Sequence, residues 1–123
     1  MPAPNMILLF VKSPQDSVKF YRDTLELKVI EDSPTFAMLP LNDSTMLGLW
    51  AAAGAKPKVT ALPGAMEIGI QVEDRESVDR LCADWKAKSV MIAQSPTKLD
   101  FGYTFVGLDP DGHRIRVFTP ESP

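Results

Sequence analysis

The stretch Tyr103-Thr-Phe-Val-Gly-Leu-Asp-Pro-Asp-Gly-His-Arg-Ile-Arg-Val-Phe118 has the pattern of two strands joined by a tight turn. An earlier stretch repeats it: Thr35-Phe-Ala-Met-Leu-Pro-Leu-Asn-Asp-Ser-Thr-Met-Leu-Gly-Leu-Trp50. Both contain Thr-Phe, continue as an apolar run, turn on acidic residues and return as a second strand. Two such copies indicate an internal repeat, which constrains the fold more than a single motif does.

The segments that precede these two stretches also resemble each other. Val11-Lys-Ser-Pro-Gln-Asp-Ser-Val18 and Val72-Glu-Asp-Arg-Glu-Ser-Val78 each end an apolar strand and begin a helix. Ser13 is a predicted N-cap followed by Pro14 at the first helical position, and Asp74 is the predicted N-cap of the second helix. The chain therefore reads as an α+β protein of two strand–helix–three-strand (βαβββ) modules.

The predicted elements follow the same order in both halves. Strands are expected at 5–12, 27–31, 35–39 and 45–51 in the first module, with a helix at 14–25. Strands are expected at 67–73, 90–93, 103–108 and 113–119 in the second, with a helix beginning after Asp74. We expect one domain over residues 1–123, with modules at about 4–51 and 64–120 and a connection at about 52–63. Periodicity predicts these inner helix residues: Val18, Tyr21, Leu25, Val78, Leu81, Cys82 and Trp85.

Composition restricts the class of protein. The chain has 45% hydrophobic and 24% charged residues, which is typical of a globular domain. A net charge of -3 argues against a nucleic-acid partner, which would favour a basic surface. No apolar run is long enough for a membrane span, and the first residues lack the pattern of a secretory signal. Together with a single cysteine, Cys82, this predicts a cytoplasmic protein.

Alternation along the strands separates two faces of the predicted sheets. The aliphatic parity, expected under the helices, consists of Ile7, Leu9, Val11, Leu47, Leu49, Ile68, Ile70, Val72, Ile115 and Val117. The other parity is mixed and consists of Met6, Leu8, Phe10, Met46, Gly48, Trp50, Glu67, Gly69, Gln71, Arg114, Arg116 and Phe118. This mixed face is either an ordinary half-exposed sheet face or the lining of a ligand cavity. We favour the cavity, because Gly48 and Gly69 would leave room there.

Several motifs together resemble the glyoxalase/bleomycin-resistance, or vicinal oxygen chelate, superfamily. They are the segments at 11–18, Phe20-Tyr21-Arg22-Asp23-Thr24-Leu25-Glu26-Leu27, and Asp109-Pro-Asp-Gly-His-Arg-Ile115. The resemblance covers nearly the whole chain. It implies two βαβββ modules forming a curved mixed sheet, commonly in a homodimer.

The resemblance also implies where a metal would bind in the enzymes of this superfamily. The four positions correspond to Met6, Gly48, Glu67 and Arg116. Only Glu67 is a suitable ligand, because Met6 is a soft donor, Gly48 has no side chain and Arg116 is a permanent cation. We therefore expect no metal, no cofactor and no catalytic residue. One alternative is a metal-dependent lyase, dioxygenase or transferase that takes substitute ligands from Asn5, Asp100 or the partner chain, or that uses Glu67 as a base. Another is a relative by fold only, with a metabolic or regulatory role.

The chain is more similar to metal-free members of the superfamily that bind phenazine-type antibiotics. This implies sequestration of a planar aromatic molecule, giving drug resistance, by a homodimer. The predicted ligand-binding residues are Phe10, Met46, Gly48, Trp50, Glu67, Phe101, Tyr103, Arg116 and Phe118. Trp50 is interpreted as a stacking platform or, alternatively, as a core or interface residue. Arg116 either pairs with Glu67 or binds a ligand carboxylate. We interpret Trp85 and Cys82 as core residues, and the only histidine, His113, as structural.

Overall fold

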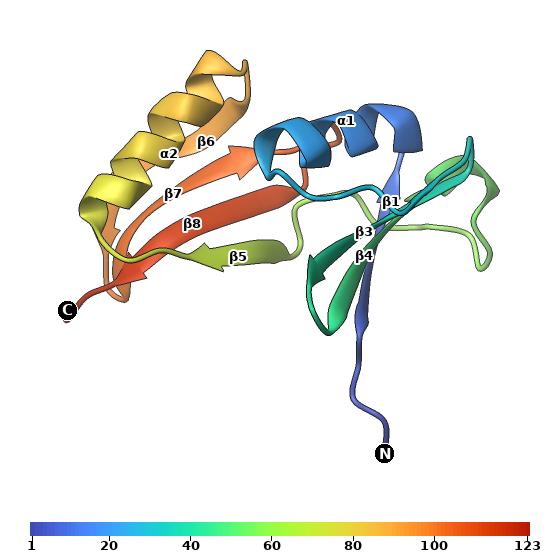
Figure 1. Cartoon of the computed structure of the whole chain (residues 1–123), viewed down its shortest axis with the longest axis horizontal. Helices are drawn as coiled ribbons and strands as arrows, with labels where there is room; N and C mark the ends of the chain where they lie inside the picture. The colour runs from blue at the N-terminus through green and yellow to red at the C-terminus, as the bar shows by residue number, and fades with distance from the viewer. The chain divides into compact units, whose positions relative to one another are not determined.

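The computed structural model describes residues 1–123, which divide into two compact units, Met1–Ala61 and Leu62–Pro123. Each unit contains one long helix and one four-stranded mixed sheet, in the order strand, helix, three strands (Figure 1). The predicted α+β fold of two βαβββ modules is confirmed. The division falls inside the expected connection at 52–63. Neither helix is long and apolar enough to cross a membrane.

The first unit has the strand order β1-β4-β3-β2. Its elements are β1 (Met6–Val11), α1 (Pro14–Thr24), β2 (Glu31–Asp32), β3 (Phe36–Asn42), β4 (Thr45–Ala51) and the 3₁₀ turn η1 (Ala52–Gly54). β1 and β4 are parallel, whereas β3 is antiparallel to both β4 and β2.

The strand predicted at 27–31 is wrong for most of its length, because only Glu31 and Asp32 pair with β3. The chain is still turning away from α1 in this region. Glu26 has a positive φ of 59°, and the Leu27 N–H donates to the Tyr21 carbonyl at 3.2 Å. Residues 27–29 therefore follow the helix end, and pairing with β3 begins only at Ile30, whose N–H donates to the Met38 carbonyl at 2.9 Å.

The start of α1 follows the predicted capping chemistry. The Ser13 side chain accepts a hydrogen bond from the Asp16 backbone N–H at 3.3 Å, and Pro14 is the first helical residue. The Ser13 hydroxyl thus satisfies one of the free backbone N–H groups in the first turn, and Pro14 has no N–H that needs an acceptor. Val18 and Tyr21 are then buried from the helix side, where they complete the core of the unit.

The second unit has the strand order β5-β8-β7-β6. Its elements are β5 (Glu67–Gln71), α2 (Arg75–Ala87), β6 (Met91–Leu99), β7 (Gly102–Leu108) and β8 (Arg114–Pro120). β6 is longer than the strand predicted at 90–93. Its register with β7 shifts between Ile92 and Gln94 and between Gln94 and Thr97. These irregularities accommodate Pro96, which has no N–H for a ladder hydrogen bond and is tolerated here because β6 is an edge strand.

Trp85 is the centre of the second core. It is 1% exposed, and its ring meets Phe105 edge-on at a centroid distance of 5.0 Å. A Cβ at Gly107 would come within 2.8 Å of the Trp85 ring, so a glycine is required beneath it. Cys82 is also buried, and this burial raises the pKa of its thiol. Both residues are core residues, as predicted.

The turn from β7 to β8 sets the register that positions the charged residues of β8. Gly112 has a positive φ of 95°, and its N–H donates to the Asp109 carbonyl at 3.0 Å. The buried Asp109 carboxylate accepts from the backbone N–H groups of Asp111 and His113 at 2.9 and 2.8 Å. The turn then aligns Leu108 with Arg114 and Val106 with Arg116.

Candidate functional site

Each sheet has one face covered by the helix of its own unit and one face turned away from it, here called the open face. The aliphatic parity is the covered one, since Leu9, Val11, Leu47, Leu49, Ile115 and Val117 are all 3% exposed or less. The mixed parity lies on the open faces, where most side chains are half-buried or exposed. The open faces are the candidate binding surfaces.

An aromatic row crosses the open face of the first unit. Trp50 on β4 lies between Phe10 on β1 and Phe36 on β3 in the strand register. The Phe10 and Trp50 ring centroids are 5.7 Å apart with a 36° angle between the planes. All three rings are half-buried, so part of each remains accessible. Phe36, which the sequence prediction missed, is placed here by its cross-strand pairing with Trp50.

Gly48 does not open a cavity beside this row. A Cβ built there would lie 2.5 Å from Leu8 and 3.2 Å from the Phe36 ring. These two side chains therefore fill the space that the glycine was expected to leave. Met46, one row further along, is half-buried and is aligned with the exposed Met6. The open face of the first unit is thus an apolar, fairly continuous surface.

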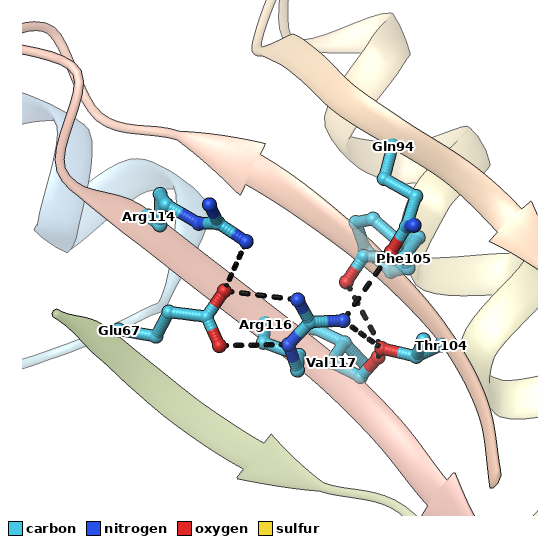
Figure 2. A network of polar contacts seen from close by, with 7 residues as sticks. All are labelled: Glu67, Gln94, Thr104, Phe105, Arg114, Arg116 and Val117. Atoms are coloured by element: carbon cyan, nitrogen blue, oxygen red, sulfur yellow. Dashed lines mark hydrogen bonds and ion pairs between the residues drawn. The ribbon is translucent and has the colours of Figure 1, made fainter. Parts of the chain in front are cut away.

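A charged network lies on the open face of the second unit (Figure 2). The Glu67 carboxylate accepts from Arg116 through Nε at 2.8 Å and through Nη2 at 2.9 Å. Arg114 Nη2 lies 2.6 Å from the Glu67 Oε2 atom. The Glu67–Arg116 pair proposed from the sequence is therefore present. The bonds and charge of Arg116, reinforced by those of Arg114, lower the pKa of Glu67.

Arg116 is held from both sides of its guanidinium group. Its Nη1 donates to Gln94 Oε1 at 3.3 Å and to Thr104 Oγ1 at 3.2 Å, opposite Glu67 (Figure 2). The Thr104 hydroxyl in turn donates to the Val117 carbonyl at 2.8 Å. Each guanidinium nitrogen of Arg116 thus has an acceptor. Of the two interpretations of Arg116, this geometry favours the internal pair over a ligand carboxylate.

Sequence reasoning missed three members of this network: Arg114, Gln94 and Thr104. Arg114 could have been found, because it has the same parity as Arg116 and lies directly opposite Glu67 in the β5–β8 register. Gln94 could not, because it lies beyond the predicted end of its strand and next to register shifts.

Two predicted aromatic residues lie beside Arg116. The Phe101 and Phe118 rings meet edge-on at a centroid distance of 6.0 Å. The guanidinium carbon of Arg116 is 5.6 Å from the Phe101 ring centre, within the range of a cation–π contact. Gly69 is exposed, and the nearest atom to a Cβ there would be in Phe118, at 3.6 Å. The open face is therefore less filled at Gly69 than at Gly48.

Tyr103 lies apart from these residues. Its hydroxyl donates to Asp79 of α2 at 2.7 Å, and the Arg75 guanidinium carbon is 4.4 Å from its ring centre. The Asp79 contact raises the pKa of the Tyr103 hydroxyl. Tyr103 faces the helix-covered side of its sheet, whereas Arg116 faces the open side.

The residues at the four implied metal positions do not fit a divalent cation. Glu67 is the one hard ligand among them, and both of its carboxylate oxygens are bound by guanidinium groups. The Arg116 charge occupies the place of a further ligand. No group of three or more His, Cys, Asp or Glu side chains in residues 1–123 is arranged to hold a metal ion.

Comparisons with known proteins agree with this architecture. Residues 3–117 match the family model for the glyoxalase/bleomycin resistance protein/dioxygenase superfamily. The phenazine antibiotic resistance protein EhpR of Enterobacter agglomerans is 32% identical over 117 residues, covering 93% of this chain and 89% of that protein.

Two solved structures have the same fold. A protein of Agrobacterium tumefaciens solved by NMR is 38% identical, with a TM-score of 0.89 and coverage of 99% of this chain and 100% of that one. A glyoxalase-related enzyme of Fulvimarina pelagi is 20% identical, with a TM-score of 0.82 and coverage of 97% and 88%. The chain belongs to the glyoxalase/bleomycin resistance protein/dioxygenase superfamily.

Proposed function

We propose that this protein binds and sequesters a planar aromatic small molecule, such as a phenazine-type antibiotic, without a metal, and so gives drug resistance. The observation that carries the proposal is the row of Phe10, Trp50 and Phe36 on the open face of the first unit. The name of the relative EhpR, a phenazine antibiotic resistance protein, supports this class of ligand.

The aromatic row suits a flat ligand for a physical reason. A tricyclic ring covers more area than one side chain, so it can contact several neighbouring rings at once. Each offset or edge-on aromatic contact adds about 0.5–1.5 kcal/mol beyond the area that it buries. Three partly accessible rings in one register row can supply that affinity without a hydrogen bond to the ligand core.

Sequestration needs tight binding and no chemical step. The Glu67–Arg116 pair supports a metal-free protein, because a guanidinium group bound to the carboxylate competes with a cation for the same oxygen atoms. We expect no stoichiometric Ni, Zn, Fe, Mn or Mg after dialysis of the purified protein. Elemental analysis that finds about one metal ion per chain, with binding or activity lost to a chelator, would favour the metal-dependent enzyme instead.

The proposal includes a homodimer. Met6 and Leu8 on the open face of the first unit are 43% and 39% exposed, and they continue the apolar surface of the aromatic row. A second copy is the commonest way to cover such a surface. Light scattering should give twice the chain mass of 13.6 kDa, and a mass of one chain at all micromolar concentrations would exclude the dimer.

A fluorescence titration tests the binding site. In a Trp85→Phe variant, Trp50 is the remaining tryptophan, so quenching by phenazine-1-carboxylate reports on the aromatic row. We expect saturable quenching with a Kd between nanomolar and tens of micromolar, about −12 to −6 kcal/mol. The matched control is Trp50→Phe, in which only the buried Trp85 emits and quenching should be much weaker. Equal quenching in the two variants would place the ligand away from Trp50.

A further inference from the structure

Residues 120–123, here called the strap, run past the turn that joins β6 to β7, entirely within the second unit. The Glu121 N–H donates to the Phe101 carbonyl in this turn at 3.0 Å. The approach is close, because a Cβ at Gly102 would collide with the Thr119 carbonyl. The strap therefore binds the turn through the backbone.

The Glu121 side chain ties the strap to two further elements. Its carboxylate accepts from Arg75, the first residue of α2, through Nε at 2.6 Å and through Nη2 at 2.8 Å. At the end of β6, the Lys98 ammonium group lies 3.4 Å from Glu121 Oε1 and donates to the Ser122 carbonyl. Two cations, one of them bidentate, thus converge on one carboxylate, and such a network is stronger than a single exposed ion pair.

Arg75 is itself held in place by Tyr103. The guanidinium carbon of Arg75 lies 4.4 Å from the centre of the Tyr103 ring, and the Tyr103 hydroxyl donates to Asp79 of α2. A guanidinium group that rests on an aromatic ring loses less freedom when it binds a carboxylate. Tyr103 thus supports the Arg75–Glu121 pair.

The turn that the strap binds also carries an aromatic side chain. Phe101 is 45% exposed, and its ring lies against Phe118 and over the Arg116 guanidinium group. A hollow of about 530 Å³ lies beside this ring. It is lined by Lys98, Leu99, Asp100, Phe101 and Pro123. Because this space leaves the turn room to move, the position of the turn depends on the strap.

We propose that Glu121 is a latch that holds the β6–β7 turn against the strap and so keeps the Phe101 ring over Arg116. When the carboxylate is released, the turn gains mobility and the ring leaves the Arg116 guanidinium group. Arg75 and Tyr103 are positioning residues, because they act on the turn through Glu121. The latch is a conformational device of the second unit, and it does not depend on the ligand of the proposed function.

Hydrogen exchange measured by NMR tests the latch at its backbone contact. Arg75→Gln removes the bidentate partner and leaves Glu121 in place, so exchange of the Glu121 N–H should become at least about threefold faster. The Val72 N–H, which donates to the Phe118 carbonyl elsewhere on β8, should keep its rate. Arg80→Gln is the matched control, since the Arg80 guanidinium group donates to Ser77 of the same helix. It should leave both rates unchanged.

A fluorine label reports on the side chain that the latch positions. With para-fluorophenylalanine in place of Phe101, fluorine NMR measures how far the ring remains beside Phe118 and Arg116. Arg75→Gln and Glu121→Gln should each move the signal toward its value in the unfolded chain. Arg75→Lys keeps the charge but loses the planar fork, so its signal should lie between those of the parent and Arg75→Gln. Thermal melts show that each variant is folded.

The unaltered protein provides a test that needs no variant. The ion pair of the latch is partly exposed, with side-chain exposures of 53% for Arg75 and 25% for Glu121, so salt screens it. At about 1 M sodium chloride, where the screening length is about 3 Å, exchange of the Glu121 N–H should accelerate relative to that of Val72.

Three results would overturn the latch. The first is an exchange rate of the Glu121 N–H that neither Arg75→Gln nor salt changes. The second is equal acceleration at Glu121 and Val72, because the ion pair would then support the whole unit. The third is a faster Glu121 N–H with an unchanged fluorine signal, because the strap would then not control the Phe101 ring.

Discussion

The two units have the same topology but differ in the chemistry of their open faces. Across its three long strands, the open face of the first unit carries aromatic, Met, Leu, Pro and Gly residues without an ionisable side chain. The open face of the second unit carries Glu67, Arg114 and Arg116, joined to Gln94. Their helix-covered faces, by contrast, are both largely apolar and buried.

The fold restricts the side chains on the helix-covered faces more than those on the open faces. A helix covers a sheet stably only if the facing side chains are apolar, so both units share that pattern. No such requirement acts on the open faces. They have diverged into an apolar surface on the first unit and a mixed charged and aromatic surface on the second.

The largest expected effect is a difference in protein stability between variants of the two tryptophans. Trp85 is fully packed against Phe105 and Gly107, so Trp85→Ala should lower the free energy of unfolding by about 3–5 kcal/mol. Trp50 is half-buried on an open face, so Trp50→Ala should lower it by far less. Urea denaturation of both variants measures this difference. Equal losses would mean that Trp50 is a core residue.

The next effect concerns the ion pair of the second unit. Glu67→Gln leaves both Arg114 and Arg116 without their anion, whereas Arg116→Met leaves Glu67 paired with Arg114. We expect Glu67→Gln to lower the free energy of unfolding by about 1–3 kcal/mol and to be more destabilising than Arg116→Met. This loss is below the about 3–5 kcal/mol expected for breaking a fully buried pair. The reduction follows from the 30% exposure of Glu67 and the 16% exposure of Arg116.

A double-mutant cycle checks this pairing. The double variant Glu67→Gln/Arg116→Met should recover much of the loss caused by Glu67→Gln, because it removes the buried cation as well. Strictly additive losses would show that the two residues are not energetically coupled.

A smaller effect should appear in acid. Hydrogen bonds from Arg75 lower the pKa of Glu121 to about 2, and Arg116 lowers that of Glu67. A carboxylate whose pKa is lower in the folded protein than in the unfolded chain stabilises the folded state at pH values above its unfolded pKa, here 4.5. This stabilisation is lost as the pH falls toward the pKa of the folded state. Stability should therefore decrease from about pH 4.5 downward.

Variants in the second unit should change this acid dependence. Glu121→Gln and Glu67→Gln should each flatten the decrease in acid, whereas Asp43→Asn in the exposed turn of the first unit serves as a matched charge control. Melting temperatures between pH 2 and pH 6 provide the measurement. If the control flattens the curve as much as Glu121→Gln does, the ion pairs of the second unit are not its cause.

The sequence predicted the parts of this molecule that follow from local rules. Periodicity and capping placed both helices and the Trp85 core, and strand parity placed Glu67 with Arg116. The end of β6 was missed because its residues pair through register shifts, which have no periodic signature. Tyr103 was grouped with the ligand residues because the family resemblance did not indicate which face of the sheet it lies on. Its hydrogen bond to Asp79 depends on the position of α2, which the sequence does not specify. The filled space at Gly48 depends on the side-chain conformations of Leu8 and Phe36.

The most direct test of the central claim is the affinity of phenazine-1-carboxylate for Trp50→Ala, measured by calorimetry. Loss of the stacking platform should weaken binding by about 1–4 kcal/mol, the sum of the stacking contribution and the lost burial. Phe20→Ala truncates a half-buried aromatic residue on α1 that contacts Tyr21, and it should leave the affinity unchanged. A Trp50→Ala protein that is folded and binds as tightly as the parent would contradict the account, because the apolar open face of the first unit would then not hold the ligand.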